Sequence, residues 1–200
     1  MHPKYPETLN ALIGHLKKLP GVGSRTAERF AFELIRWQPT QLEELGALLV
    51  SLPHHIVPCA TCGCLTQQNT CRFCTSHSRE TRSLCILSSP RDVYAIEETR
   101  TYHGLYHVIE HLLSPLDGRH ASTLRLDRIE QRITQHHITE LILAFDSTLE
   151  GDATALYLKQ QLSKYPISIS RLAFGLPVGS NLEYVDSGTL AKAFSGRQTL

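Results

Sequence analysis

The sequence predicts an α+β protein built from several modules: an N-terminal helical region, a compact cysteine-rich motif, and an α/β domain with a mostly parallel sheet. Three observations predict this fold class. Apolar residues recur at helical spacing before residue 53, two Cys-x-x-Cys pairs follow, and from residue 84 short apolar runs alternate with amphipathic segments. Strands that alternate with helices typically form a parallel sheet with helices on both faces.

The composition is that of an ordinary globular protein, with 42% hydrophobic and 20% charged residues. The net charge is only +1, but residues 1–40 hold six lysines and arginines against three acidic residues. A basic head on a slightly acidic body is a modest indication of a nucleic-acid partner. No apolar run is long enough to span a bilayer, and MHPKYPETLN lacks the apolar core of a targeting signal. We therefore expect a cytoplasmic protein.

The N-terminal residues predict two helices joined by a glycine hairpin. Residues 7–18 show amphipathic helical spacing, and the segment LPGVG at 19–23 ends that helix. Ser24 is the expected N-cap of the second helix. Gly21 and Gly23 allow the backbone to approach a ligand, and the second helix presents free N–H groups and the positive end of its dipole.

Basic residues surround this hairpin, which makes it a candidate for gripping a nucleic-acid backbone without reading bases. The alternative is a plain helical turn with solvated basic residues. The candidate DNA-binding residues are Lys17, Lys18, Gly21, Gly23, Arg25 and Arg29.

A third helix is expected to begin at Thr40, with Glu43 completing a capping box, and to stop at Pro53. Its apolar positions are expected to form core against the hairpin. They are Leu42, Leu45, Leu48, Leu49 and Leu52.

Two Cys-x-x-Cys pairs with eight residues between them predict a structural zinc site, because two such turns can complete a tetrahedron of thiolates. The ligands would be Cys59, Cys62, Cys71 and Cys74. Two disulfides or free thiols remain the alternative, although cytosolic thiols stay reduced. The neighbouring arginines, including Arg79, are expected to be solvated.

From residue 84 the pattern predicts alternating strands and helices. The expected strands are 84–87, 104–109, 140–145 and 167–174; the expected helices run from Ser89 to about Thr99, over 125–136, from the segment after Asp146 to about Lys164, and over 188–194.

An acidic cluster follows the clearest strand, ELILAF at 140–145. Ligands of open α/β sheets bind beyond the carboxyl ends of the strands, and Asp146, Glu150 and Asp152 gather at such an end. These carboxylates could hold Mg²⁺ for phosphoryl-transfer chemistry. A solvated, helix-capping acidic loop is the equally weighted alternative.

Several motifs, taken in order, resemble one known family over nearly the whole chain. They are LKKLPGVGSRTAERFAFEL, CATCGCLTQQNTCRFC, LCILSSPRDVYAIEETRTYHGLYHVIEHLLSPLDG, ITELILAFDSTLEGDATALYL and RLAFGLPVGSNLEYVDSGTLAKAF. Together they look like RecR, the bacterial recombination mediators. The resemblance implies a helix-hairpin-helix DNA-binding region at 1–56, a four-cysteine zinc finger at 57–78, a Toprim domain at 82–178, and a Walker-B-like C-terminal segment at 179–200.

The resemblance also implies a function. Members of this family assemble into ring-like tetramers that can encircle DNA. They act with RecO and RecF to load recombinase on gapped, single-stranded DNA. It implies one structural zinc ion on the four cysteines, DNA contacts from Arg25, Arg29 and the neighbouring lysines, and a Toprim face that contacts RecO and RecF.

Catalytic Toprim domains carry a glutamate after their first strand and a later Asp-x-Asp pair. Here Ser88 stands at the glutamate position, and the pair reads Asp146-Ser147-Thr148. Without the strand-end carboxylate, phosphoryl chemistry lacks its proton handler, so we expect a binding module and not an enzyme. The alternatives are a Mg²⁺-dependent Toprim nuclease or topoisomerase fragment, and a zinc-ribbon interaction protein that never touches DNA.

Overall fold

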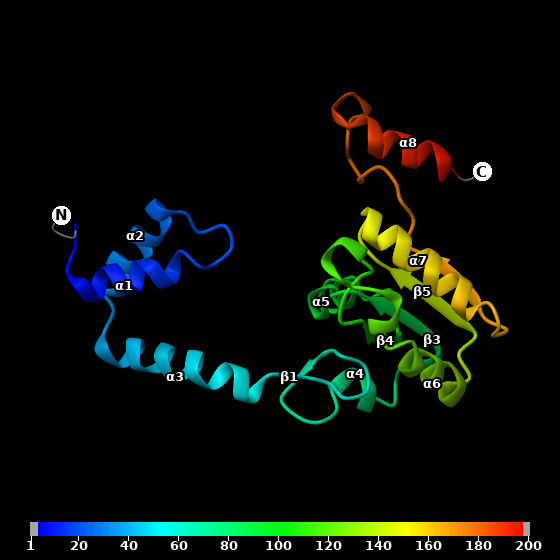
Figure 1. Ribbon diagram of the computed structural model, residues 1–200, viewed down its shortest axis with the longest axis horizontal. Coiled ribbons are helices and arrows are strands. Elements are labelled where there is room, and N and C mark those ends of the chain that lie inside the picture. The colour runs from blue at the N-terminus through cyan, green and yellow to red at the C-terminus, as the bar shows by residue number, and fades with distance from the viewer. Residues whose placement is uncertain (1–3, 198–200) are drawn as a thin grey trace. The chain divides into compact units, whose positions relative to one another are not determined.

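A computed structural model describes residues 4–197, and contacts between Cα atoms divide the chain into two units, Met1–His55 and Ile56–Leu200. The first unit contains α1 (Glu7–Leu16), α2 (Ser24–Leu34) and α3 (Pro39–His55). The expected helix, hairpin, helix order is confirmed (Figure 1).

A small apolar core holds α1 against α2. Ile13 of α1 packs with Ala27 and Ala31 of α2, and all three are buried. The N-cap of α2 is Gly23, whose backbone is extended, and no side chain caps the helix. Ser24 was therefore the wrong N-cap by one residue, because Ser24 already has helical geometry as the first residue of α2.

Helix α3 differs from expectation at both ends. At its start the backbone N–H of Gln38 donates to the side chain of Gln41, 3.1 Å away, so the cap lies upstream of Thr40 and Glu43. At its end Pro53 lies inside the helix, which continues to His55. A proline removes one backbone N–H donor. In the last turn of a helix this loses a single hydrogen bond, and the helix can continue for two more residues.

The leucines of α3 do not form a core within the chain. No residue of α3 is buried, and the side chains of Leu48 and Leu49 are 59% and 62% exposed. The expectation that this helix packs the hairpin is wrong for the single chain, because helical periodicity says that a face is apolar but does not say what covers it.

The second unit is built on a parallel sheet, as predicted. Among the described residues its strand order is β4-β3-β5-β6, and every neighbouring pair is parallel. The strands are β3 (Glu80–Leu87), β4 (Gly104–Val108), β5 (Glu140–Ala144) and β6 (Ser168–Arg171), and the helices between them are α5 (Pro90–Thr99), α6 (Leu126–His136) and α7 (Leu149–Leu162).

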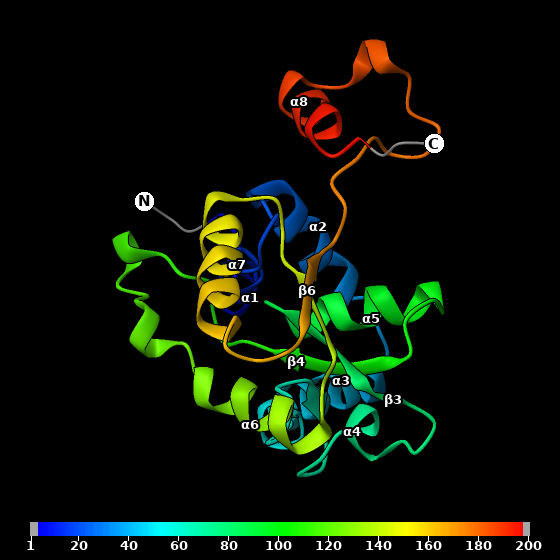
Figure 2. The same cartoon turned by 90° about the vertical axis from the view of Figure 1, so that its right-hand side faces the viewer.

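Alternating side chains of β3 face two different cores. Leu84 and Ile86 pack with residues of α6 and α7, whereas Cys85 and Leu87 pack with α5 and with the cysteine motif. Figure 2 shows α6 and α7 on one side of the sheet and α5 on the other. The cysteine motif is therefore part of the covering of the second face.

The remaining elements are short. The cysteine motif contains β1 (Val57–Pro58), β2 (Leu65–Thr66) and α4 (Arg72–Thr75), and 3₁₀ turns span Pro115–Asp117, Ala121–Thr123 and Leu182–Tyr184. The C-terminal helix α8 (Ser187–Ser195) is capped by the carboxylate of Asp186, which accepts from the N–H of Thr189 at 3.0 Å. Among residues 4–197, no helix is long and apolar enough to cross a membrane.

Candidate functional site

The four cysteines of the two Cys-x-x-Cys pairs come together in space. The Sγ atoms of Cys59, Cys62, Cys71 and Cys74 all lie within 4.8 Å of one another, and those of Cys62 and Cys71 are 3.4 Å apart. Sulfurs at about 2.3 Å from a tetrahedral zinc ion would be about 3.8 Å apart. The cluster therefore has the size and the ligands of a site that could hold a metal ion.

Backbone geometry presets this cluster. The N–H of Gly63 donates to the carbonyl of Cys59 at 2.9 Å, and the N–H of Cys71 donates to the sulfur of Cys59 at 3.3 Å. Gly63 has φ +77°, and a Cβ on it would lie 2.7 Å from the carbonyl oxygen of Val108. Only glycine satisfies both the turn and this close approach.

Hydrogen bonds among the clustered cysteines shift the pKa values of Cys71 and Cys62 in opposite directions. Hydrogen bonds from Cys62, Cys64 and Cys74 lower the pKa of Cys71, whereas hydrogen bonds to Cys64 and Cys71 raise the pKa of Cys62. One thiolate is thus stabilised at the expense of its neighbours. A thiophilic divalent cation would let all four ionise together, so the donor set fits such an ion. Cys64 is also buried beside the cluster but is not one of its four converging ligands.

The cysteine motif is docked firmly on the α/β sheet. The N–H of Val108 in β4 donates to the carbonyl of Cys62 at 2.7 Å. Arg79 forms an ion pair with Glu97 of α5 and donates from Nε to the carbonyl of Gly104 at 2.9 Å. The Arg79 side chain is only 10% exposed, so the expectation that it is solvated was wrong. The sequence pattern could not identify Glu97 as the partner of Arg79, because Glu97 lies on a separate helix, α5, and the fold brings the two together.

The hairpin between α1 and α2 is open to solvent. Its six candidate DNA-binding residues are all exposed. Gly21 has φ +77°, and a Cβ added at Gly21 or Gly23 would meet no heavy atom within 4 Å. The backbone face of the turn is therefore unobstructed, as close approach of a ligand requires.

The charges around the hairpin are uncompensated. Among the described residues no acidic side chain forms an ion pair with Lys17, Lys18, Arg25 or Arg29. The first turn of α2 contains no acidic residue either. The positive end of the helix dipole and these cations would therefore attract a polyanion together.

The acidic cluster is only partly assembled. Asp146 and Glu150 line a pocket of about 680 Å³ with Ser88 and with Glu110, which lies just beyond β4. Asp152 instead forms an ion pair with Arg171 at 2.6 Å. Within the described chain the cysteines alone form a group with metal-ligating geometry. The proposal that these carboxylates hold Mg²⁺ remains a prediction.

Glu110 was not identified from the sequence, although its position after the strand 104–109 was a usable signal. Burial, followed by repulsion from Asp146, raises the pKa of Asp92 at the same edge. The strand ends thus form an acidic, polar edge without a carboxylate at Ser88.

Comparison with known families covers most of the chain. Residues 9–52 match the family described as RecR, helix-hairpin-helix; residues 82–173 match the Toprim domain; and residues 175–198 match RecR, C-terminal.

Whole-chain relatives agree. The chain is 52% identical over 194 residues to "Recombination protein RecR" of Protochlamydia amoebophila, covering 97% of this chain and 98% of the relative. It is 48% identical over 196 residues to the protein of the same name from Chlamydia trachomatis and 49% identical to that of Chlamydia felis, with the same coverage.

Proposed function

The chain belongs to the RecR family of recombination proteins, and from this premise we propose that it is a DNA-binding mediator. The family supports a role in recombinational DNA repair. In the proposed role the protein acts with RecO and RecF to promote recombinase loading on gapped single-stranded DNA. It works in the cytoplasm.

The observation that carries this proposal is the exposed glycine hairpin with its unpaired cations. Exposed Lys17, Lys18, Arg25 and Arg29 flank a turn whose backbone is open, at the N-terminus of an eleven-residue helix. Phosphate oxygens accept hydrogen bonds from the free N–H groups of a helix N-terminus and from basic side chains, and they do so whatever the base sequence is. The hairpin therefore binds the backbone of single- and double-stranded DNA without sequence preference.

In this proposal the four cysteines hold one structural zinc ion per chain. When bound, the ion supplies cross-linking of the four thiolates and no chemistry on DNA. The cysteine residues hold the loop 59–74 closed, and the loop in turn fills one face of the sheet through the core that includes Tyr106 and Val108.

We propose assembly into a ring tetramer, as the resemblance to RecR implies, and such an assembly would offset the weak binding of one hairpin. Each neutralised phosphate contributes a salt slope of about −0.9 on duplex DNA, so one copy that neutralises few phosphates binds weakly. Several copies on one DNA add avidity. The apolar face of α3, including Leu48 and Leu49, is a surface that a second copy would cover.

The Toprim module is proposed as a partner-binding surface and not as a catalyst. Ser88 replaces the strand-end carboxylate, and Asp152 is occupied by Arg171. Asp146 and Glu150 remain available on the edge that would contact RecO and RecF. If the protein were a Mg²⁺-dependent nuclease or topoisomerase instead, it would nick or relax plasmid DNA, and Asp146→Asn would abolish that activity.

The direct test is the double variant Arg25→Ala, Arg29→Ala, compared with Arg36→Ala. Arg36 is a fitting control because it follows the far end of α2 and pairs with Glu33. Fluorescence anisotropy with single- and double-stranded DNA over a salt series should show weaker binding of the double variant to all sequences. For each phosphate that the variant no longer neutralises, the magnitude of the salt slope should fall by about 0.9 on duplex DNA and by about 0.7 on single strands.

Unchanged affinity and slope in the double variant would exclude the hairpin as the binding element. A recombinase-loading assay with RecO, RecF and gapped DNA coated with single-strand-binding protein then measures the mediator step itself. The same double variant should lower its yield, whereas Arg36→Ala should not.

A further inference from the structure

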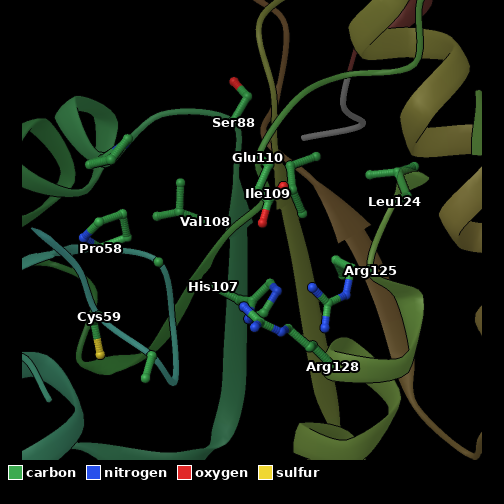
Figure 3. A pocket seen from close by; sticks show the side chains of 13 residues that line it. Pro58, Cys59, Ser88, His107, Val108, Ile109, Glu110, Leu124, Arg125 and Arg128 are labelled. Carbon is green, nitrogen blue, oxygen red and sulfur yellow. The ribbon is translucent and has the colours of Figure 1, made fainter. Parts of the chain in front are cut away.

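A pocket of about 540 Å³ lies on the second unit, between the cysteine motif, the end of β4 and the start of α6 (Figure 3). It belongs to a different unit of the chain from the hairpin, and the proposed mediator role does not use it. Its size is in the range of pockets that bind small ligands.

One end of the pocket holds a buried imidazole without a partner. His107 is 5% exposed and lines the pocket, and its Nδ1 has no hydrogen-bonding partner among the described residues. Burial, and then the positive charges of Arg132 and Arg128, lower its pKa to about 3, so the ring is neutral. Buried polar atoms nearly always have a hydrogen-bonding partner, so a molecule in the pocket would supply the partner that the chain does not.

The same end carries two arginines with little to neutralise them. Arg128 forms no ion pair or side-chain hydrogen bond among the residues that the structure describes, and Arg125 has a single 3.7 Å contact with Asp127. Both lie at the N-terminal end of α6, where the helix dipole is positive. Figure 3 shows the nitrogen atoms of His107, Arg125 and Arg128 turned toward one part of the pocket.

Away from the arginines, the lining of the pocket is first apolar and, at the far end, polar. Pro58, Val108 and Leu124 cover the middle, and Ser88 and Glu110 lie at the end away from the arginines (Figure 3). This order suits a ligand with an anionic head, a compact apolar body, and hydroxyl groups that could bond to a serine hydroxyl and a carboxylate.

We infer that this pocket binds a small phosphate monoester of about nucleoside size, with its phosphate held by His107, Arg125 and Arg128. One guanidinium group can donate two parallel hydrogen bonds to two oxygens of a phosphate. Two arginines together carry two positive charges, which match a phosphate dianion better than they match the single charge of a carboxylate. The apolar middle holds the organic body, and Glu110 repels a second anionic group from the far end.

The test is calorimetric titration of the zinc-loaded full chain with adenosine monophosphate. Wild-type protein should bind it, and Arg125→Gln and Arg128→Gln should each weaken binding at least about tenfold. Arg125→Gln is the safer variant, because its side chain is 52% exposed and its loss does not disturb packing. Arg82→Gln is the matched control, since Arg82 is exposed at the opposite end of β3.

Several results would overturn the inference. The first two are no binding of adenosine monophosphate to wild-type protein, and binding by Arg125→Gln and Arg128→Gln that is as tight as binding by wild type. The other two are inorganic phosphate that binds as tightly as the nucleotide, and a 5′-phosphorylated oligonucleotide that competes with the nucleotide and binds more tightly than it. Loss of zinc from Arg125→Gln under chelator challenge would also overturn it, because the arginine would then serve the thiolates. Unchanged DNA affinity of Arg125→Gln would separate this site from the hairpin.

Discussion

At the residue scale, the four cysteines and Arg79 show what spacing along the chain can and cannot predict. Two Cys-x-x-Cys turns were enough to predict that four sulfurs converge, because each turn fixes two side chains locally. The sequence did not identify the buried partner of Arg79, because Glu97 reaches it from a separate helix. Local chemistry was predictable, whereas partners brought together by the sheet were not.

Substitution of one ligand should release the metal. Cys71→Ser should lose the zinc ion, because it replaces one of the four thiolate ligands. Loss of the ion should lower the melting temperature strongly, because structural zinc contributes about 10–16 kcal/mol of apparent folding free energy, comparable to a whole domain's stability. Zinc content by mass spectrometry and thermal melting measure this change. Cys64→Ala is the control: Cys64 is buried beside the cluster but is not one of its ligands, so this variant should retain one zinc per chain. A Cys71→Ser protein with full zinc and unchanged melting would contradict the assignment.

At the scale of elements, the strands of the parallel sheet were the most predictable part. Continuous apolar runs such as residues 141–144 of β5 are buried or half-buried along their whole length, which is typical of a strand inside a parallel sheet. The edge strand β6 is shorter than the predicted 167–174, because its residues are only half covered and pairing stops at Arg171. The leucines of α3 were misassigned because an apolar stripe is equally consistent with core and with an interface.

A partly buried ion pair supports the cysteine motif, because the guanidinium of Arg79 lies 5.3 Å from the ring of Phe73 and pairs with Glu97. Glu97 accepts from Arg79 and, at 2.5 Å, from the hydroxyl of Tyr106. Glu97→Ala should therefore cost about 2–4 kcal/mol of the free energy of unfolding, because it leaves a largely buried guanidinium unpaired. Denaturant unfolding measures the change.

The exposed pair between Glu33 and Arg36 provides the comparison for that change. Both of its side chains are largely solvated, so Glu33→Ala should change stability by no more than about 0.5 kcal/mol. Equal destabilisation by the two variants would show that the motif is not held by Glu97.

At the scale of the whole molecule, the chain combines a hairpin that should bind DNA weakly with a helix, α3, whose apolar side chains are exposed. One hairpin with four cations can neutralise few phosphates, so useful affinity requires several copies on one DNA. The exposed side chains of α3 supply a surface for such assembly, and family membership supports the repair role in which it would act.

The most direct test of this account is the mass of the particle by light scattering, with and without DNA. We expect four chains per particle in both states, and we expect Leu48→Glu, Leu49→Glu to reduce the mass toward one chain while the fold is retained. Leu116→Glu, at a fully exposed leucine of the second unit, should leave the mass unchanged. Wild-type protein that is a single chain at every concentration, with and without DNA, would contradict the account, and so would a monomeric Leu48→Glu, Leu49→Glu variant that binds DNA as tightly as wild type.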